Sequence, residues 1–202
     1  RPDRPAESIY QECLDMAEHY LTWEGADRTA RRLLETLIRE VGRLPLAAPS
    51  PVPPSIVSTE LNSGNFLINP GGRSYLVDWE KPLLSEPAQD LGHFLAPTTT
   101  FWKTDVILSP EDIGDFLRRY AAAADGRLDL AALRERLPLY FTVTCLRGVS
   151  WCAMAMVEYA GPDRALTNAD TLVKLGQYLS PDFLEHILNA YVRRDFLKGV
   201  SV

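Results

Sequence analysis

The chain has 202 residues, of which 46% are hydrophobic, 24% charged and 9% aromatic, and its formal net charge is −6. This length can bury one sizeable core, and the composition is that of a folded domain, which excludes a disordered chain. The acidic balance disfavours nucleic acid and anionic membrane surfaces, so we expect no nucleic-acid partner and no membrane partner.

Three cysteines, Cys13, Cys145 and Cys152, form an odd set without a C-x-x-C pair. This usage predicts small buried apolar residues rather than a zinc site or a disulfide. No stretch near Arg1 has the layout of a secretory signal, and the longest apolar stretch, 140–160, is interrupted by charged residues. We therefore expect a cytoplasmic protein.

The first part of the chain predicts two amphipathic helices. Apolar residues recur at steps of three and four over 6–21 and again over 27–41. Five prolines follow between Gly42 and Ser55, where they exclude a helix and predict an extended connector.

Next the sequence predicts a small β element about a third of the way along the chain. Short β-prone runs lie at 55–58, 65–68 and 74–77. The last two runs are separated by Asn69-Pro70-Gly71-Gly72-Arg73, which indicates a hairpin. After Asp78 we expect no further strand.

Helices account for the remainder of the prediction, and Pro110, Pro138 and Pro181 fit first-turn positions. Their expected ranges are 88–95, 110–124, 130–137, 138–159, 168–178 and 181–198. Ser109 and Ser180 are suitable caps before two of them. The fold class expected from these elements is α+β, predominantly α-helical.

Polar side chains gather at the ends of the predicted strands. Glu60 follows the first strand, Asn65 begins the second, and Asp78 and Glu80 follow the third. Because the strands adjoin, we expect these groups to converge. Carboxylate and amide oxygens bind Mg²⁺, and a carboxylate can accept the proton of a hydroxyl, so the pattern is consistent with phosphoryl transfer.

The order and spacing of these residues resemble the aminoglycoside phosphotransferase and choline kinase family, whose loop reads His-Gly-Asp-x-x-x-x-Asn. Here Ser58 stands in the histidine position, Glu60 in the catalytic aspartate position and Asn65 in the metal asparagine position. Asp78, in Asp-Trp-Glu, matches the metal aspartate of kinases. The later segment 87–91, Pro-Ala-Gln-Asp-Leu, is similar to the family's Pro-x-x-Asp-Leu.

This resemblance implies the C-terminal lobe of a protein-kinase-like fold. It implies an Mg²⁺-dependent kinase that transfers the γ-phosphate of ATP or GTP to a hydroxyl of a small acceptor, which is aminoglycoside-, choline- or sugar-like. Glu60 would be the catalytic base, and Asn65 and Asp78 would bind the metal and thereby the nucleotide. Glu80 either reaches a metal or pairs with a nearby cation. Asp90 is expected to accept backbone hydrogen bonds, as a helix cap or as the residue that orients the catalytic loop.

On this resemblance, 1–202 form one lobe with a single core. Its parts are expected to be a linker, a helical pair, a Pro-rich connector, the catalytic and metal loops, and a helical substrate-binding region, at 1–5, 6–42, 43–55, 56–80 and 88–202. The sequence holds no glycine-rich phosphate loop with a strand lysine. We therefore expect a further N-terminal lobe of the same protein to hold most of the nucleotide, and this lobe alone to be inactive. A non-catalytic, kinase-like binding or regulatory domain stays an open alternative, because of Ser58 and Glu60.

Overall fold

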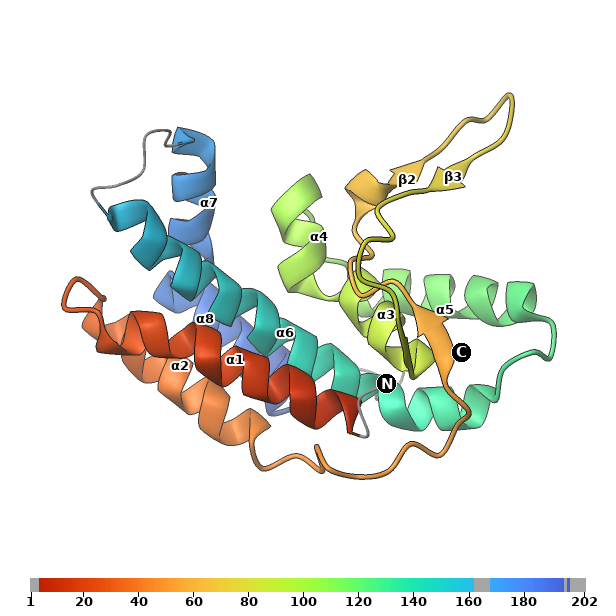
Figure 1. Cartoon of the computed structure of the whole chain (residues 1–202), viewed down its shortest axis with the longest axis horizontal. Helices are drawn as coiled ribbons and strands as arrows, with labels where there is room; N and C mark the ends of the chain where they lie inside the picture. The colour runs from red at the N-terminus through yellow and green to blue at the C-terminus, as the bar shows by residue number, and fades with distance from the viewer. Residues whose placement is uncertain (1–3, 162–167, 195, 197–202) are drawn as a thin grey trace. The chain divides into compact units, whose positions relative to one another are not determined.

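The structure is a computed structural model of the chain and describes residues 4–161, 168–194 and 196. It is mainly helical with a few short strands (Figure 1), which confirms the predicted α+β, predominantly α-helical class. The chain divides into two compact units. One is built mainly from Ala48–Phe141, the other from Ala6–Ala47 and Thr142–Asp195. That all parts share one core stays a prediction.

The unit formed by Ala6–Ala47 and Thr142–Asp195 has only helices as regular elements within the residues described. Its helices are α1 (Pro5–Thr22), α2 (Arg28–Val41), the later part of α6 (Leu130–Ala160), α7 (Ala169–Tyr178) and α8 (Pro181–Ile187). Helix α2 begins where the Asp27 carboxylate accepts hydrogen bonds from the amides of Thr29 and Ala30. It buries Leu34 and Leu37 on the face that packs against α8.

The other unit holds the strands and the residues singled out above. Its elements are β1 (Ser55–Val57), β2 (Phe66–Leu67), β3 (Tyr75–Leu76), β4 (Leu83–Ser85), α3 (Pro87–Leu95), α4 (Pro97–Thr104), α5 (Pro110–Ala124) and the start of α6. The strands form two separate antiparallel pairs, β1 with β4 and β2 with β3. Pairing Phe66 with Leu76 closes the predicted hairpin around its Pro- and Gly-bearing turn.

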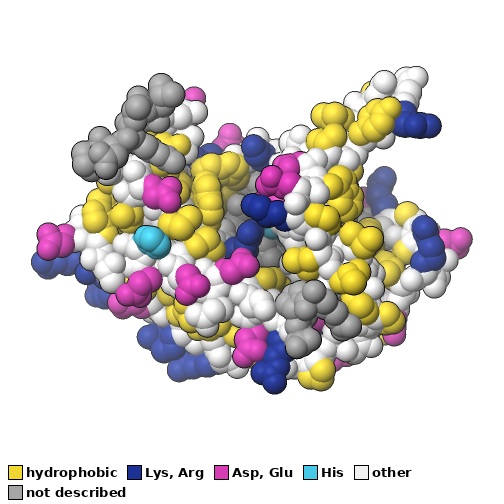
Figure 2. Space-filling view, in the orientation of Figure 1, with side chains coloured by type: hydrophobic (Ala, Val, Ile, Leu, Met, Phe, Trp, Pro, Cys, Tyr) yellow, Lys and Arg dark blue, Asp and Glu magenta, His cyan; other side chains and the backbone are white. Residues whose placement is uncertain are grey.

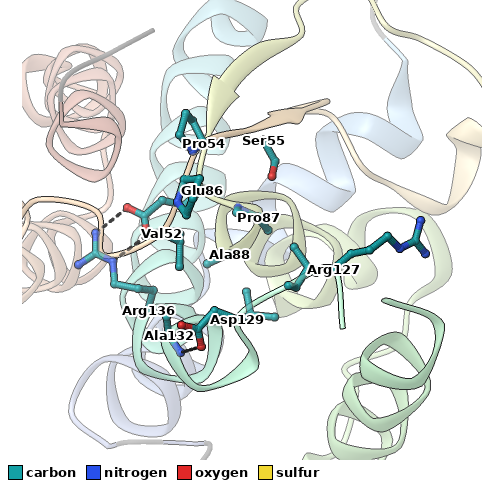
Figure 3. A pocket seen from close by; sticks show the side chains of 13 residues that line it. Val52, Pro54, Ser55, Glu86, Pro87, Ala88, Arg127, Asp129, Ala132 and Arg136 are labelled. Carbon is teal, nitrogen blue, oxygen red and sulfur yellow. Dashed lines mark hydrogen bonds and ion pairs between the residues drawn. The ribbon is translucent and has the colours of Figure 1, made fainter. Parts of the chain in front are cut away.

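A buried ion pair fastens the start of α3 to α6. The Arg136 guanidinium donates two hydrogen bonds of 2.8 Å to the Glu86 carboxylate (Figure 3). The Tyr140 hydroxyl donates a third, also of 2.8 Å. Burial and the Glu86 carboxylate raise the pKa of Tyr140, so its hydroxyl stays protonated as a donor. One turn further along α3, a methyl group on Gly92 would lie 2.9 Å from the backbone nitrogen of Phe141, so only glycine permits this approach.

The β2–β3 hairpin extends away from the helices of its unit and exposes apolar side chains (Figures 1 and 2). Ile68, Leu67 and Tyr75 are 70%, 52% and 55% exposed, respectively. Two strands of two residues each, with so little burial, are stabilised mainly by the turn that joins them and by the contacts of the residues at their ends.

Two elements of the Ala48–Phe141 unit were not predicted. Strand β4 lies beyond Asp78, where the sequence was expected to form no strand, because a three-residue run shows no alternation and its partner β1 lies far away in sequence. Helix α4 contains Thr98, Thr99 and Thr100. Their low helix propensity is the reason that the sequence did not predict a helix here. Pro97 at its first turn and the buried side chains of Thr98 and Thr99 support the helix.

Two predicted boundaries were also wrong. The ranges 130–137 and 138–159 are one helix, α6, with Pro138 inside it. A proline inside a helix costs about 3 kcal/mol, and the burial of Leu137, Leu139 and Tyr140 around it offsets this cost. The last helix was expected to reach 198, but α8 ends at Ile187 and passes into a π-helical turn, Leu188–Val192; part of the remainder of that range lies outside the described residues.

All three cysteines are free thiols and buried, as expected. Burial raises the pKa of Cys13 to about 12 and also raises the pKa of Cys145 and Cys152. Helix α6, which carries the latter two, is long and apolar enough to cross a membrane by length and composition, but 67% of its most apolar window is buried inside the structure. A buried core helix passes the same test.

Candidate catalytic and metal loops

The loop after β1 is anchored by a carboxylate from α3. Asp90 Oδ2 accepts a hydrogen bond of 2.8 Å from the Ser58 amide, and Asp90 Oδ1 accepts one of 2.9 Å from the Thr59 amide. This confirms the predicted role of Asp90 as an acceptor for the loop backbone. Burial raises the pKa of Asp90, although the two amide donors act in the opposite direction.

Backbone conformation at Thr59 turns the chain toward Glu60. Thr59 has φ 67°, in the left-handed region that a β-branched residue rarely adopts. Its hydroxyl donates a hydrogen bond of 3.3 Å to the Lys81 carbonyl. The neighbouring Ser58 is 1% exposed, and its hydroxyl has no hydrogen-bond partner among the described residues. Ser58 therefore contributes to the loop through its backbone.

Asn62 shapes the segment between Glu60 and Asn65. Its Oδ1 accepts a hydrogen bond of 3.0 Å from the Gly64 amide, and its Nδ2 donates one of 3.1 Å to the Glu60 carbonyl. A short helical turn, η1 (Ser63–Asn65), follows directly. Asn62 was not among the predicted site residues, although an Asn two residues before a Gly is a local turn signal that could have identified it.

Asn65 joins the two loops. Its side-chain Nδ2 donates a hydrogen bond of 2.9 Å to the Glu60 carbonyl and lies 3.4 Å from Asp78 Oδ2. The backbone carbonyl of Asn65 accepts a hydrogen bond of 3.0 Å from the Val77 amide. The β2–β3 hairpin makes this possible, because it brings together residues that flank its two strands. Asp78 itself is exposed and has φ 66°. These contacts bring the Asn65 side chain to Asp78 and to the backbone of Glu60; that the Glu60 carboxylate converges on them stays a prediction.

Glu60 and Glu80 differ from these anchored groups. Glu60 is half-buried, and none of the described residues donates a hydrogen bond to its carboxylate. Glu80 is exposed, and its carboxylate lies 3.5 Å from Lys81 Nζ. Between the two alternatives stated for Glu80, the structure thus contains the surface ion pair, a contact worth about 0–1 kcal/mol.

The donor atoms at this cluster fit Mg²⁺. Because Nδ2 of Asn65 contacts the Glu60 carbonyl and Asp78 Oδ2, the Oδ1 atom of the same amide is left as an oxygen ligand for a metal. Within the part of the chain that the structure describes, no three His, Cys, Asp or Glu side chains gather as a metal cage. Mg²⁺ is usually bound by one or two carboxylates with water and phosphate oxygens, so a protein cage is not required.

A comparison with protein-family models identifies the family of the chain. The family model described as the phosphotransferase enzyme family, APH, matches residues 2–138. No curated protein and no solved structure matched the chain. The matched range includes the anchored loop, the hairpin, Asp78 and Asp90.

Proposed function

Because the chain belongs to the phosphotransferase enzyme family, we propose that it supplies the metal-binding and acceptor-positioning side of a small-molecule kinase. The reaction is the Mg²⁺-dependent transfer of the γ-phosphoryl group of ATP or GTP to a hydroxyl of a small acceptor. The observation that carries this proposal is the double contact of Asn65 Nδ2 with the Glu60 carbonyl and Asp78 Oδ2. It joins the base-bearing loop to the metal aspartate.

In this proposal Glu60 holds the acceptor and removes its proton. The acceptor oxygen forms a bond to the γ-phosphorus, the bond from that phosphorus to the β–γ bridging oxygen breaks, and the nucleoside diphosphate leaves. The hydroxyl proton moves to the Glu60 carboxylate, which is available because no described residue binds it. Asn65 Oδ1 and Asp78 would hold Mg²⁺, which supplies neutralisation of the phosphate charge when bound.

Positioning supplies most of the rate in such a reaction, and the loop is suited to it. The Asp90 carboxylate fixes the backbone immediately before Glu60, and Asn62 and Asn65 fix the Glu60 carbonyl. A glycine-rich loop and a strand lysine that clamp the β- and γ-phosphates are absent from the 202 residues. We assign that clamp to a further N-terminal lobe, without which the chain should bind Mg²⁺-nucleotide weakly and should not turn over.

The metal role can be tested with two matched substitutions, Asp78→Asn and Asp125→Asn. Both aspartates are exposed and adopt positive φ, at 66° and 47°, and asparagine tolerates that conformation. Each change removes one charge without straining the backbone. Mn²⁺ affinity and phosphoryl transfer from ATP to a panel of alcohols would be measured in the protein with its nucleotide lobe.

The proposal expects Asp78→Asn to weaken Mn²⁺ binding and to lower turnover by a factor of about 100 or more, with Asp125→Asn close to wild type. Glu60→Gln should lower kcat with little change in Mn²⁺ affinity, since it removes the base and leaves the metal donors. If Asp78→Asn binds Mn²⁺ like wild type and no alcohol is phosphorylated by any form, the chain is a non-catalytic kinase-like domain instead.

A further inference from the structure

A cavity of the Ala48–Phe141 unit lies beside the candidate catalytic loop. It encloses about 280 Å³ between α3, α4, α5 and the η1 turn. Its walls include Phe94 and Phe116, and its polar groups include Ser63, Thr100 and Thr104. Small-molecule sites usually enclose about 300–1,000 Å³, so this volume suits a small compound.

The cavity is close to the reacting groups. Ser63, which lines it, lies two residues before Asn65 and three residues after Glu60. A chain spans at most about 3.6 Å per residue, which places the Ser63 Cα within about 7 Å of the Asn65 Cα and about 11 Å of the Glu60 Cα. Helix α4 also packs against η1, so the cavity wall and the loop are parts of one packed structure.

An aromatic row connects the cavity wall to the metal side of the loop. Phe66, the residue after Asn65, lies with its ring centroid 5.3 Å from that of Phe94, and Phe94 lies 5.2 Å from Phe116. Tyr120 continues the row at 6.3 Å, in a stacked arrangement with Phe116. The apolar surface of the cavity is thus continuous with the residues that position Asn65.

The polar groups of the cavity suit a neutral hydroxyl compound. The hydroxyls of Thr100 and Thr104 donate to the carbonyls of Ala96 and Thr100, at 3.4 and 2.7 Å. Their oxygens keep lone pairs that can accept a hydrogen bond from a ligand hydroxyl. The ligand can donate such a hydrogen bond from a hydroxyl group without carrying a charge.

Among the described residues, the cavity has one carboxylate in its wall and one lysine side chain near it, so it offers no cluster of anions for a polycation. The carboxylate that lines it, Asp112, accepts hydrogen bonds from the Ser109 hydroxyl and amide at 2.6 and 3.0 Å, and these bonds lower its pKa. Asp112 is therefore an ionised carboxylate at the cavity wall that also caps α5. The Lys103 side chain lies over the loop, since a Cβ on Gly64 would be 3.9 Å from Lys103 Cε. A cationic side chain thus lies near the η1 turn at the cavity wall, and its charge opposes that of Asp112.

We propose that this cavity is the acceptor site and that the acceptor is a small, uncharged alcohol with an apolar or aromatic body. The proposal rests on the proposed kinase function and specifies its substrate class. The apolar body packs against the surface that Phe94 and Phe116 form together, and the hydroxyl is directed toward Ser63 and Glu60. The transfer step is the one given above, with the acceptor hydroxyl as the attacking oxygen.

Binding can be tested without turnover by using two probes of equal size and shape. These are 2-phenylethanol, which is neutral, and 2-phenylethylamine, which is a cation at pH 7. The expected result is that 2-phenylethanol binds at least tenfold more tightly and shifts the amide resonances of Ser63 and Gly64. Equal or tighter binding of the amine, or shifts confined to other parts of the chain, would overturn the proposal.

A filling substitution provides the matched control. Thr100→Leu narrows the cavity, and Thr36→Leu makes the same change on α2, where the Thr36 hydroxyl donates to the Arg32 carbonyl just as Thr100 donates to Ala96. Both threonines are half-buried, so effects on folding are comparable. Thr100→Leu should weaken 2-phenylethanol binding at least tenfold and Thr36→Leu less than twofold; equal weakening by both would contradict the assignment.

A charge substitution then separates this proposal from the function on which it rests. Thr100→Glu should lower kcat/KM for neutral alcohols and raise it for amino alcohols in the enzyme with its nucleotide lobe. If transfer depends on Asp78 but Thr100→Glu changes neither value, the kinase function stands and the acceptor site lies elsewhere. If no phosphoryl transfer occurs but Thr100→Leu still weakens the binding of 2-phenylethanol, the cavity is a ligand site and the proposed kinase function is wrong.

Discussion

The loop that follows β1 and the turn that follows β3 meet at Asn65, but the first is tied to the interior and the second lies at the surface. Asp90 binds two consecutive amides of the first loop, and α3, which carries Asp90, is held by the buried Glu86–Arg136 pair. Asp78 is exposed, and Asn65 Nδ2 approaches its carboxylate at 3.4 Å. The difference indicates that the backbone of Glu60 is positioned before any ligand binds, whereas the Asp78 carboxylate is held by one long contact.

The largest effect should come from the ion pair that holds α3. Arg136→Met leaves the Glu86 carboxylate buried with one hydroxyl donor, so the free energy of unfolding should fall by about 3–5 kcal/mol. Urea unfolding measures this loss. In the double variant Glu86→Gln/Arg136→Met no charge is left unpaired, and most of the stability should return. A double variant no more stable than Arg136→Met would contradict the anchoring role.

Removing the Asp90 carboxylate should cause the next largest loss of stability, and it should also disturb the loop that carries Glu60. Asp90→Ala leaves the Ser58 and Thr59 amides without their acceptor, which should cost about 2–4 kcal/mol of stability. Turnover of the complete enzyme should fall in variants that are still folded, because the backbone before Glu60 loses its support. Asp90→Asn, which keeps one acceptor oxygen, should lie between Asp90→Ala and wild type.

The same carboxyl should leave a smaller signature in pH dependence. Burial, the largest cause, raises the pKa of Asp90 in the folded protein above its ordinary value of 3.8. Between the two values the native state binds more protons than the unfolded state, so this group's contribution to stability is present below pH 3.8 and is lost as the pH rises through the folded pKa. The stability of wild type relative to Asp90→Asn should therefore decline over that window in urea titrations. A rise would show that the two amide bonds outweigh burial.

A gain in stability is expected at Thr59. Its left-handed conformation costs about 1–2 kcal/mol relative to glycine, and Thr59→Gly forfeits a weak hydrogen bond to Lys81 and some chain entropy, which leaves a net gain of about 0.5 kcal/mol. Thr59→Val keeps the β-branch and loses the hydroxyl, so it should destabilise. Thermal unfolding of both variants separates backbone strain from the hydrogen bond.

The exposed turn should give the smallest change in stability. Asp78→Asn keeps a residue that tolerates positive φ and removes a surface charge, so the free energy of unfolding should stay within about 0.5 kcal/mol of wild type. Urea unfolding in the absence of metal measures it. A loss of stability as large as that of Asp90→Ala would mean that the Asp78 side chain stabilises the fold as much as Asp90 does.

The sequence predicted the parts of the site that depend on local order. The hairpin turn and the strand ends placed Asn65 and Asp78 together, and the Pro-x-x-Asp-Leu segment identified Asp90 as an acceptor for the loop. These predictions succeeded because the contacts follow from short strands and a short turn. The roles of Glu60, Asn65, Asp78 and Glu80 in chemistry stay predictions.

The features that the sequence did not predict depend on distant partners or on backbone conformation. Glu86 and Arg136 are 50 residues apart, and no local pattern marks them as a pair. Strand β4 exists because β1 lies beside it, and α4 forms against the low helix propensity of its threonines. The positive φ of Thr59 falls at the glycine position of the family's His-Gly-Asp loop. A threonine there gives no sequence signal that the backbone must adopt a left-handed conformation.

The buried cysteines have a practical consequence for spectroscopy. Reaction with maleimides requires an exposed thiolate, and burial keeps Cys13, Cys145 and Cys152 inaccessible and protonated at neutral pH. A cysteine introduced at the hairpin tip, as in Gly71→Cys, has open space around it, with Asn69 Oδ1 at 3.8 Å as its nearest neighbour. Such a variant would accept a single fluorophore or spin label without removal of the native thiols, and the label would report directly on whether the exposed hairpin changes its surroundings when a metal–nucleotide complex binds.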